Sequence, residues 1–223
     1  MLILKYPSHP IIVAGGSPSY ATITHVASVG SVNNKTCNVP TNVLNDLILV
    51  HMAEYDNTGS VITAPTGYTE ITLAAKQQSS PFFVQQKLAY KFSNGSEPAT
   101  VSWTDTVFSY AETQVSVYRN VDVTNPLDTN SISNGGSTAS VTTGSIVPVT
   151  NGNMIVLHHV GYGNSISVAP TGMTSRLTTD GVCNVYDLLQ AVAASLSKTY
   201  TRNGSDGDDP WVNSMISLRP KTL

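Results

Sequence analysis

The chain has 223 residues, of which 11% are charged, with a net charge of −3 and a pI near 5.9. Ordinary soluble domains carry roughly 25% charged residues. Here serine, threonine, asparagine and glycine supply the polar surface, and these residues favour turns over helices. The 11 lysines and arginines form no cluster, and no run of 18 apolar residues occurs. We therefore expect no nucleic-acid partner and no membrane insertion.

Residues 1–19 differ from the rest because three prolines and a Gly-Gly pair interrupt two short apolar segments. Proline cannot donate a ladder hydrogen bond, so this stretch does not fit a central strand. It is either a frayed tail or edge strand, or an extended N-terminal arm. As an arm, it needs a neighbouring subunit to cover the apolar residues Leu2, Ile3, Leu4, Tyr6, Ile11, Ile12 and Val13. It lacks the features of a signal peptide, so we expect the protein to be made in a cytoplasm and used as synthesised.

From residue 20 onward, short β-type segments alternate with turns. Apolar and polar residues alternate in 100–104, whereas 47–52 is a short continuous apolar run; both patterns are typical of strands. A loop is expected at 77–81. The predicted strands are 21–29, 36–39, 47–52, 61–63, 69–73, 82–92, 100–104 and 110–118, followed by 154–160, 165–168, 185–194, 197–200 and 211–218.

Two stretches are harder to interpret. Residues 120–145 are polar, but Val121, Ile132 and Val141 recur among them, which favours an ordered surface loop with short strands over a flexible linker. Residues 187–197 have some helical character but no capping residue. Their counterpart in the first part of the chain is the strand at 86–92, so a strand is favoured.

The sequence contains an internal repeat of two copies. In each copy an Asn/Asp/Gly turn precedes an apolar run, and Ala-Pro-Thr-Gly follows later. Asp46 and Asn153 are 107 residues apart (153 − 46), Pro65 and Pro170 are 105 apart (170 − 65), and Arg119 and Arg219 are 100 apart (219 − 119). The sequence therefore predicts one all-β domain over 20–223, an antiparallel β-sandwich with pseudo-repeats at about 45–119 and 152–219.

The two cysteines, Cys37 and Cys183, are far apart and lack metal-ligand spacing. They are expected to be reduced packing residues. His158 and His159 are neighbours on a strand and must point to opposite faces, so they cannot chelate one metal together. His51 matches His158 in the repeat, which could bring the two side chains close. Packing is favoured over a metal site for this pair.

The acidic loop 203–209 resembles oxygen-rich calcium loops and offers Asp206, Asp208 and Asp209 as ligands, but it lacks the bidentate glutamate that follows such loops. A polar hairpin turn is favoured there, and no metal or other cofactor is expected. The remaining acids are scattered and accompany no nucleophile motif. We therefore expect no enzymatic activity. Three tyrosines near loop ends could instead stack on sugars: Tyr55, Tyr68 and Tyr162.

Several short fragments occur in a fixed order along residues 20–220. They are Val39-Pro40, Asn45-Asp46-Leu47-Ile48-Leu49, Ala64-Pro65-Thr66-Gly67-Tyr68, Glu97-Pro98-Ala99, Tyr118-Arg119-Asn120-Val121-Asp122 and Asn125-Pro126-Leu127-Asp128. Together they resemble a jelly-roll-like β-sandwich family that is common in bacteriophage virion proteins. In this chain Asn45 and Asn120 stand where the family has glycine, and Tyr68 where it has tryptophan.

The resemblance implies a structural role and no reaction. We expect a capsid decoration or cement protein in the virion, made in the cytoplasm of a bacterial host and held by protein–protein contacts. Its partners would be major capsid or tail proteins and copies of itself. The alternative is a tail or fibre component whose β-sandwich binds host surface glycans.

Overall fold

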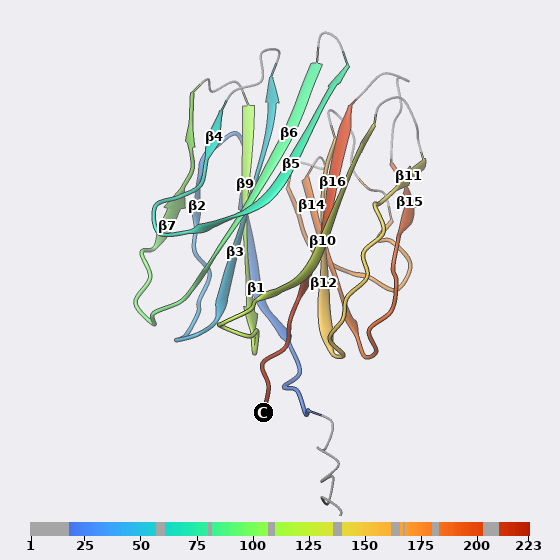
Figure 1. Ribbon diagram of the computed structural model, residues 1–223. Helices are drawn as coiled ribbons and strands as arrows, with labels where there is room; N and C mark the ends of the chain where they lie inside the picture. Colours follow the sequence, from blue (N-terminus) through green and yellow to red (C-terminus); the bar gives the residue numbers. More distant parts are fainter. Residues whose placement is uncertain are drawn as a thin grey trace, which may run out of the picture.

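The computed structural model describes residues 18–56, 61–79, 82–106, 110–135, 140–161, 166, 168–179, 183–202 and 210–223. These residues contain antiparallel strands and turns and no helix, as the sequence predicts. Figure 1 shows two long sheets facing each other, with short strands outside each of them. Residues 1–17 of the arm predicted at 1–19 lie outside the described residues, and so does the acidic loop at 203–209.

The first long sheet is formed by residues of the first half of the chain. Its central strand β3 pairs with β9 on one side and β6 on the other, and all neighbours are antiparallel. In spatial order the strands are β1 (Thr24–Ser31), β9 (Tyr110–Arg119), β3 (Leu47–Asp56), β6 (Phe82–Phe92) and β5 (Thr69–Ser79).

The second long sheet has an equivalent arrangement. Its central strand β12 pairs with β16 and β14, again antiparallel. The spatial order is β10 (Leu127–Gly135), β16 (Trp211–Leu218), β12 (Asn153–Gly161), β14 (Cys183–Gln190) and β13 (Thr174–Thr179). In both sheets the last long strand of the half lies between the first strand and the central one.

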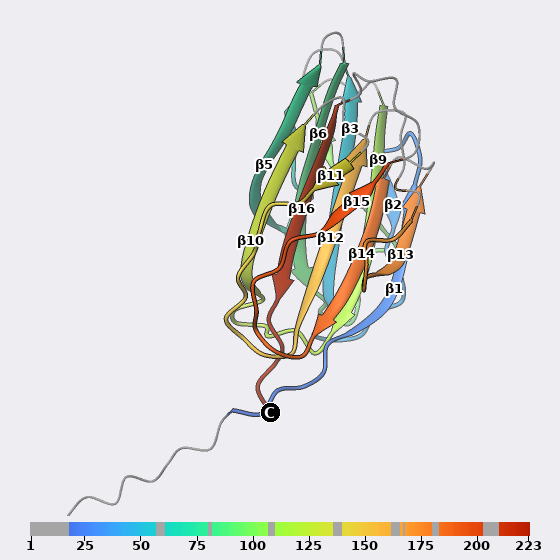
Figure 2. The same cartoon turned by 90° about the vertical axis from the view of Figure 1, so that its right-hand side faces the viewer.

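Short two-stranded sheets cover the outer faces, giving the layers seen in Figures 1 and 2. At the edges of the long sheets, β5 lies beside β10 and β1 beside β13. The short pairs are β2 (Thr36–Asn38) with β7 (Thr100–Ser102), β4 (Ile62–Thr63) with β8 (Thr104–Asp105), and β11 (Ser140–Thr142) with β15 (Thr199–Thr201).

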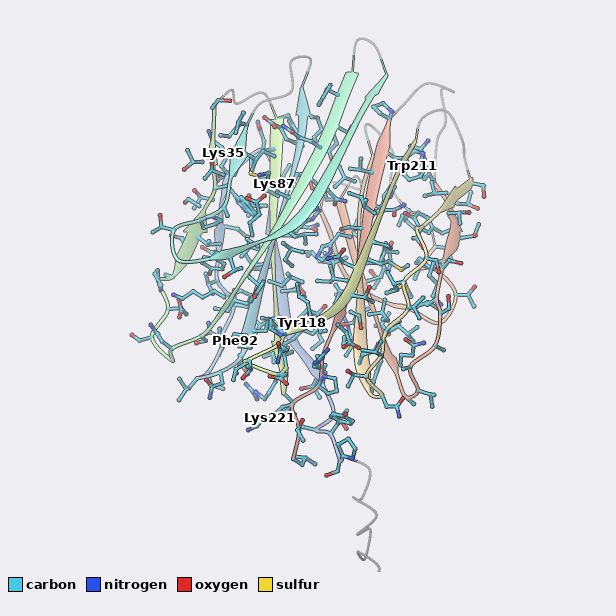
Figure 3. All side chains as sticks on the ribbon, in the orientation of Figure 1. Lys35, Lys87, Phe92, Tyr118, Trp211 and Lys221 are labelled. Carbon is cyan, nitrogen blue, oxygen red and sulfur yellow. The ribbon has the colours of Figure 1, made fainter. Side chains whose placement is uncertain are left out.

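The central strands are buried on both faces. Every residue of β12 and β16 is buried, because each long sheet is covered by the other sheet on one side and by short strands on the other. A strand covered on both sides reads as a continuous apolar run, which is why 47–52 does not alternate. Side chains fill the spaces between the layers (Figure 3).

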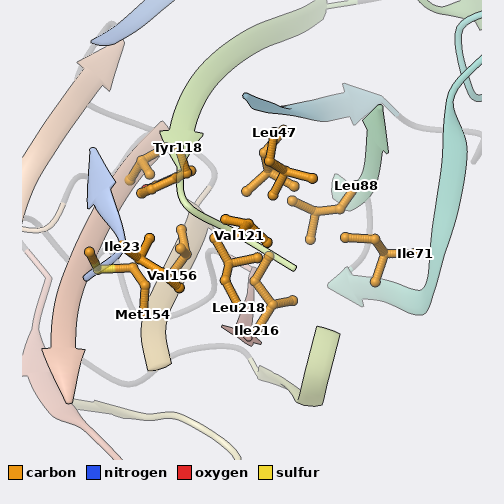
Figure 4. Packing of buried hydrophobic residues seen from close by; sticks show 12 residues of the cluster. Ile23, Leu47, Ile71, Leu88, Tyr118, Val121, Met154, Val156, Ile216 and Leu218 are labelled. Carbon is orange, nitrogen blue, oxygen red and sulfur yellow. The ribbon is translucent and has the colours of Figure 1, made fainter. Parts of the chain in front are cut away.

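In the described residues four apolar clusters follow from this layering, and the smallest of them also joins the two long sheets: Ala53, Tyr55, Val84, Val160, Cys183 and Val212. The inter-sheet core joins both halves and includes Leu49, Tyr118 and Val156 (Figure 4). The first outer core lies between the first long sheet and its short strands, and includes Cys37, Val50 and Trp103. The second outer core occupies the same place behind the second long sheet: Val141, Ile146, Ile155, Leu157, Ile166, Met173, Tyr186, Tyr200, Trp211 and Met215.

Several predicted boundaries were wrong. Residues 120–145 are not mainly a surface loop, because β10 is a full strand of the second sheet whose polar residues pair with β16. The loop expected at 77–81 is shorter, since β5 extends to Ser79 by pairing with Phe82. Of the strand expected at 165–168, residues 165 and 167 lie outside the described residues, and Ile166 forms an isolated bridge with Arg202. The strand preference at 187–197 was right for its first part only, because β14 ends at Gln190.

Three described asparagines, Asn33, Asn45 and Asn120, adopt a left-handed backbone conformation, and the last two adjoin long strands. Asn45 has φ 68° before β3, and Asn120 has φ 67° after β9. Asparagine tolerates this region better than other residues with a Cβ, although glycine is the usual choice. This conformation explains why a turn of this kind accepts either residue at the two positions.

Candidate functional sites

The first candidate site is the end of the molecule at which both described termini lie, which we call the terminal end. It consists of residues 18–23, 39–46, 93–99, 120–126, 143–152, 191–198 and 219–223, which adjoin the same ends of the paired strands. The backbone N–H of Leu223 donates to the Ser19 carbonyl at 3.0 Å, and that of Ala21 donates to Lys221 at 2.9 Å. Figure 3 shows Lys221 at this end and Trp211 at the opposite one.

An ion pair fixes the terminal end in the first half. Asp46 accepts from Nε and Nη2 of Arg119, both at 2.8 Å, and from the Val43 N–H at 2.9 Å. Burial alone would raise the pKa of Asp46, but the hydrogen bonds from Arg119 and Val43 lower it overall. The pair therefore ties the 39–46 turn to the end of β9.

A larger network fixes the second half. The Asp128 carboxylate is fully buried and accepts from Arg219 Nη2 at 2.7 Å, the Thr150 N–H at 2.7 Å and the Val149 N–H at 3.0 Å. The Thr150 hydroxyl adds a bond at 2.9 Å. Burial would raise the pKa of Asp128, but these hydrogen bonds lower it. The sequence pattern identified Arg219 and missed its partner, because the position that matches Asp46 is Asn153.

Around these anchors the terminal end exposes aliphatic side chains. Val43 and Leu44 stand on the turn bound to Asp46, and Val147 and Val149 on the loop bound to Asp128, so the backbone that presents these four is fixed. The exposed fractions of the aliphatic side chains are 50% for Val43, 62% for Leu44, 52% for Val123, 60% for Val147, 73% for Val149, 66% for Val192 and 79% for Leu223. Apolar residues gathered on a fixed surface are typical of a protein–protein contact.

The second candidate site is a hollow of about 240 Å³ outside the first sheet, beside Tyr68. Lys91 Nζ lies 5.9 Å from the centre of the Tyr68 ring and 2.6 Å from Glu97 Oε2. The hydroxyls of Thr66, Thr100 and Ser102 also line it. An aromatic ring surrounded by hydroxyl and charged groups suits a polar ligand that has an apolar face.

Electrostatics in this hollow are set by the ion pair. Burial, and then the charge of Glu97, raise the pKa of Tyr68 to about 12. Burial opposes ionisation of Glu97, but hydrogen bonds from Lys91 and the Asn94 N–H lower its pKa overall. At neutral pH the site thus holds a neutral phenol beside a Lys–Glu pair. The sequence analysis selected Tyr68 and missed Lys91 and Glu97, which reach it only through the pairing of β5 with β6 and the 93–99 turn.

The other two tyrosines do not form a common site with Tyr68. Tyr55 is 6% exposed, and its hydroxyl lies 3.2 Å from Cys183 Sγ between the long sheets. The expectation that its ring is exposed for sugar stacking was therefore wrong, because β3 continues inward to residue 56. Tyr162 lies outside the described residues.

Both cysteines and three of the histidines, His51, His158 and His159, are buried. Cys37 and Cys183 are both free and buried, as predicted. His51 and His158 face each other across the two sheets with ring centroids 4.8 Å apart, so the closeness expected from their equal positions is confirmed. His159 points to the other face, where Tyr200 OH lies 2.9 Å from its Nδ1. Over the described residues, no three His, Cys, Asp or Glu side chains gather as metal ligands; the predicted candidates Asp206, Asp208 and Asp209 lie outside them.

No long apolar helix that could cross a membrane is present in the described part of the chain. Comparisons with protein-family models, with curated proteins and with solved structures found no match for this chain. The terminal end and the Tyr68 hollow therefore have to be interpreted from their own geometry.

Proposed function

We propose that this chain is a non-enzymatic structural protein of a bacteriophage particle, held in place through protein–protein contacts at its terminal end. The observation that carries the proposal is the set of exposed aliphatic side chains on anchored loops at the point where the chain enters the body. The sequence fragments that resemble virion β-sandwiches support the same role. A capsid decoration or cement protein, made in the host cytoplasm and assembled into the virion, suits this arrangement best.

The architecture supports the proposal in a second way. We interpret the body as one jelly-roll-like module used twice, because each half places its first, last and central long strands in the same order. In each half the short outer strands close the module from the far side. Packing two such modules through their long sheets leaves the terminal end free to carry contacts to neighbouring subunits.

The arm and the terminal end would act together. Ser19 accepts a hydrogen bond from the Leu223 N–H, so the arm is joined to the body at the terminal end. Burying a valine or leucine side chain against a neighbour contributes about 1.5–3 kcal/mol. Ordering the chain and losing rigid-body freedom offset much of that gain. Repetition of the contact over a particle restores strength through avidity.

The experiment is incorporation of tagged variants into particles of the phage that encodes the chain. Deletion of residues 1–17 keeps the Ser19–Leu223 bond and is expected to reduce incorporation at least tenfold. The double variant Val147→Ser and Val149→Ser should also reduce it. Val61→Ser is the matched control, because Val61 is 64% exposed but lies away from the terminal end. Absence of the full-length protein from particles would refute the proposal, and full incorporation of all variants would remove the terminal-end contact.

The Tyr68 hollow favours a second candidate function, recognition of a host surface glycan by a tail or fibre component. Sugar rings stack their C–H faces on aromatic side chains, and their hydroxyls pair with charged groups such as Lys91 and Glu97. A glycan array followed by titration calorimetry tests it. Tyr68→Ala should abolish binding, whereas Tyr68→Phe, which keeps the ring, should retain most of it. An array without any binding would exclude this function.

A further inference from the structure

A group of buried polar side chains interrupts the apolar contact between the two long sheets. We call it the polar seam: His51, Gln86, Glu112, Gln114, His158, Thr179 and Cys183, each no more than 7% exposed. Strands β3, β6 and β9 of the first sheet supply four of these residues, and β12, β13 and β14 of the second supply three. Along β3 and β12 the seam histidines stand between residues of the apolar inter-sheet core and residues of a second, smaller apolar cluster that also joins the two sheets.

Hydrogen bonds across the seam fix the proton of His51. Gln114 Nε2 donates to Thr179 Oγ1 at 2.7 Å and to the Cys183 carbonyl at 3.1 Å, so its Oε1 is the atom that faces His51 Nδ1 at 3.1 Å. Neutral His51 therefore carries its proton on Nδ1. Gln86 Oε1 lies 2.9 Å from His51 Nε2, and the Gln86 Nε2 has no partner among the described residues. Because an amide oxygen only accepts, His51 Nε2 is an acceptor when the Gln86 amide is turned so that its NH₂ group donates to the ring. Neither nitrogen reaches water, and the ring is held neutral by its surroundings.

His158 completes the pair from the opposite sheet. Its Nδ1 is buried and has no hydrogen-bond partner among the described residues. Burial and the nearby His51 lower the pKa of His158 well below its usual range. Burial lowers the pKa of His51 to about 4, although the hydrogen bonds of the two glutamines oppose this effect. Two imidazolium ions with centroids 4.8 Å apart would repel each other in a region that excludes water.

Other titratable groups face the seam from the elements around it. The carboxylate of Glu112 (β9) accepts from the Thr179 hydroxyl, which separates it from Gln114 and His51. Tyr55 (β3) contacts Cys183 (β14), and burial raises the pKa of both groups, so they stay neutral. The remaining neighbours on β6, β13 and β16 are Gln86, Thr179 and Ser214, which do not titrate. Glu112 is thus the carboxylate that faces the pair, and it is bound elsewhere.

We propose that the polar seam is an acid-responsive joint, at which the two sheets part locally in mild acid while the apolar inter-sheet core still holds them together. In the closed joint both histidines are neutral. In the opened joint they gain water and regain a pKa near 6.5. Opening therefore takes up protons as the pH falls from about 6.5 toward 4, and acid favours the open form. At pH 5 each histidine shifts the equilibrium about 30-fold toward opening, or about 1,000-fold for the pair.

The two native cysteines report on this opening in the full-length protein. Cys183 lies in the seam, and Cys37 lies in the first outer core. The thiols are labelled with 4,4′-dithiodipyridine at pH 7.5, 6.0, 5.0 and 4.5, and each rate is divided by the rate for denatured protein at the same pH. We expect the normalised rate of Cys183 to rise by at least 100-fold between pH 7.5 and 5.0, while Cys37 stays protected. A constant rate for Cys183, or equal rises for both thiols, would overturn the proposal.

Two variants separate the joint from general acid sensitivity. His158→Gln removes one titrating ring from the seam and should reduce the rise at pH 5 by about 30-fold. His159→Gln is the matched control, because that ring faces the second outer core, and it should leave the rise near the wild-type value. Equal effects of both variants would contradict the assignment. Should His158→Gln not fold, hydrogen exchange of the wild type decides: β13 and β14 must lose protection at pH 5 before β2 and β7 do.

Discussion

The two halves of the molecule share a strand order but differ in the polar groups that complete them. Ile48 and Val50 of β3 have buried apolar counterparts in β12, whereas Met52 is matched by His159. Opposite these positions, the central residue of the outer strand is Val101 in β7 and Tyr200 in β15. The first outer core is therefore apolar where the second contains a hydrogen-bonded His–Tyr pair.

The same contrast appears at the outer turn of each half. Tyr68 and Met173 follow equivalent turns, in which their N–H groups donate to Pro65 and Pro170 at 3.0 and 2.9 Å. Met173 is buried in the second outer core, whereas Tyr68 is half-buried and borders the hollow. The two halves can differ at these positions and still keep the same strand order, because the strand order depends on the buried apolar residues of the strands. Specific sites can thus arise in one half without changing the other.

The largest difference between the halves is expected at the two carboxylate anchors. Asp128→Ala removes a fully buried carboxylate. The N–H groups of Thr150, Val149 and Arg219 that donate to it then lose their acceptor. Loss of one partner of a buried ion pair costs about 3–5 kcal/mol. Asp46→Ala removes fewer bonds, to an Arg119 side chain that is 44% exposed, and should cost about 2–3 kcal/mol. Urea unfolding at pH 7.5 measures both. An equal or larger loss for Asp46→Ala would show that the second network is not the stronger anchor.

The second prediction concerns a substitution that gives the second outer core the same residue as the first at one matching position. Burial, then Arg202 and His51, lower the pKa of His159 to about 3. The folded state therefore binds this proton less readily than the unfolded state, and stability present above pH 6.5 is lost as the pH falls toward 3. His159→Met, which copies Met52, should reduce the loss of unfolding free energy between pH 7.5 and 5 by about 2 kcal/mol. Urea titrations at the two pH values test this. The reverse exchange, Met52→His, should add acid sensitivity to the first half.

The smallest effects are expected at the two Pro-Thr-Gly turns. Gly67 and Gly172 have φ values of 81° and 78°, and a Cβ at Gly67 would meet no atom within 4 Å. Alanine at either position should therefore lower the free energy of unfolding by about 1–2 kcal/mol, the cost of holding a residue with a Cβ in the left-handed region. The two melting temperatures should fall by the same amount in calorimetry. A clearly larger effect at one turn would show that the halves are not equivalent there.

The sequence by itself determined the strands that bury both faces and the turns between them. A continuous apolar run such as 47–52 has few alternatives, and the Pro-Thr-Gly turns depend on local backbone preferences. The matching positions of His51 and His158 indicated that the two side chains could lie close, and their ring centroids are 4.8 Å apart. These features depend on neighbours along the chain or on the repeat itself.

Only the tertiary structure decided which polar residues act together. β10 is polar along most of its length, and it forms a strand because its backbone pairs with the free edge of β16. Arg219 pairs with Asp128 because β10 begins beside the end of β16, a contact that the repeat pattern did not indicate. Tyr55 is buried within β3 and Tyr68 is half-buried after a turn, although the sequence analysis placed both near loop ends. In each case the outcome depends on which surface covers the residue, and that surface comes from a distant part of the chain.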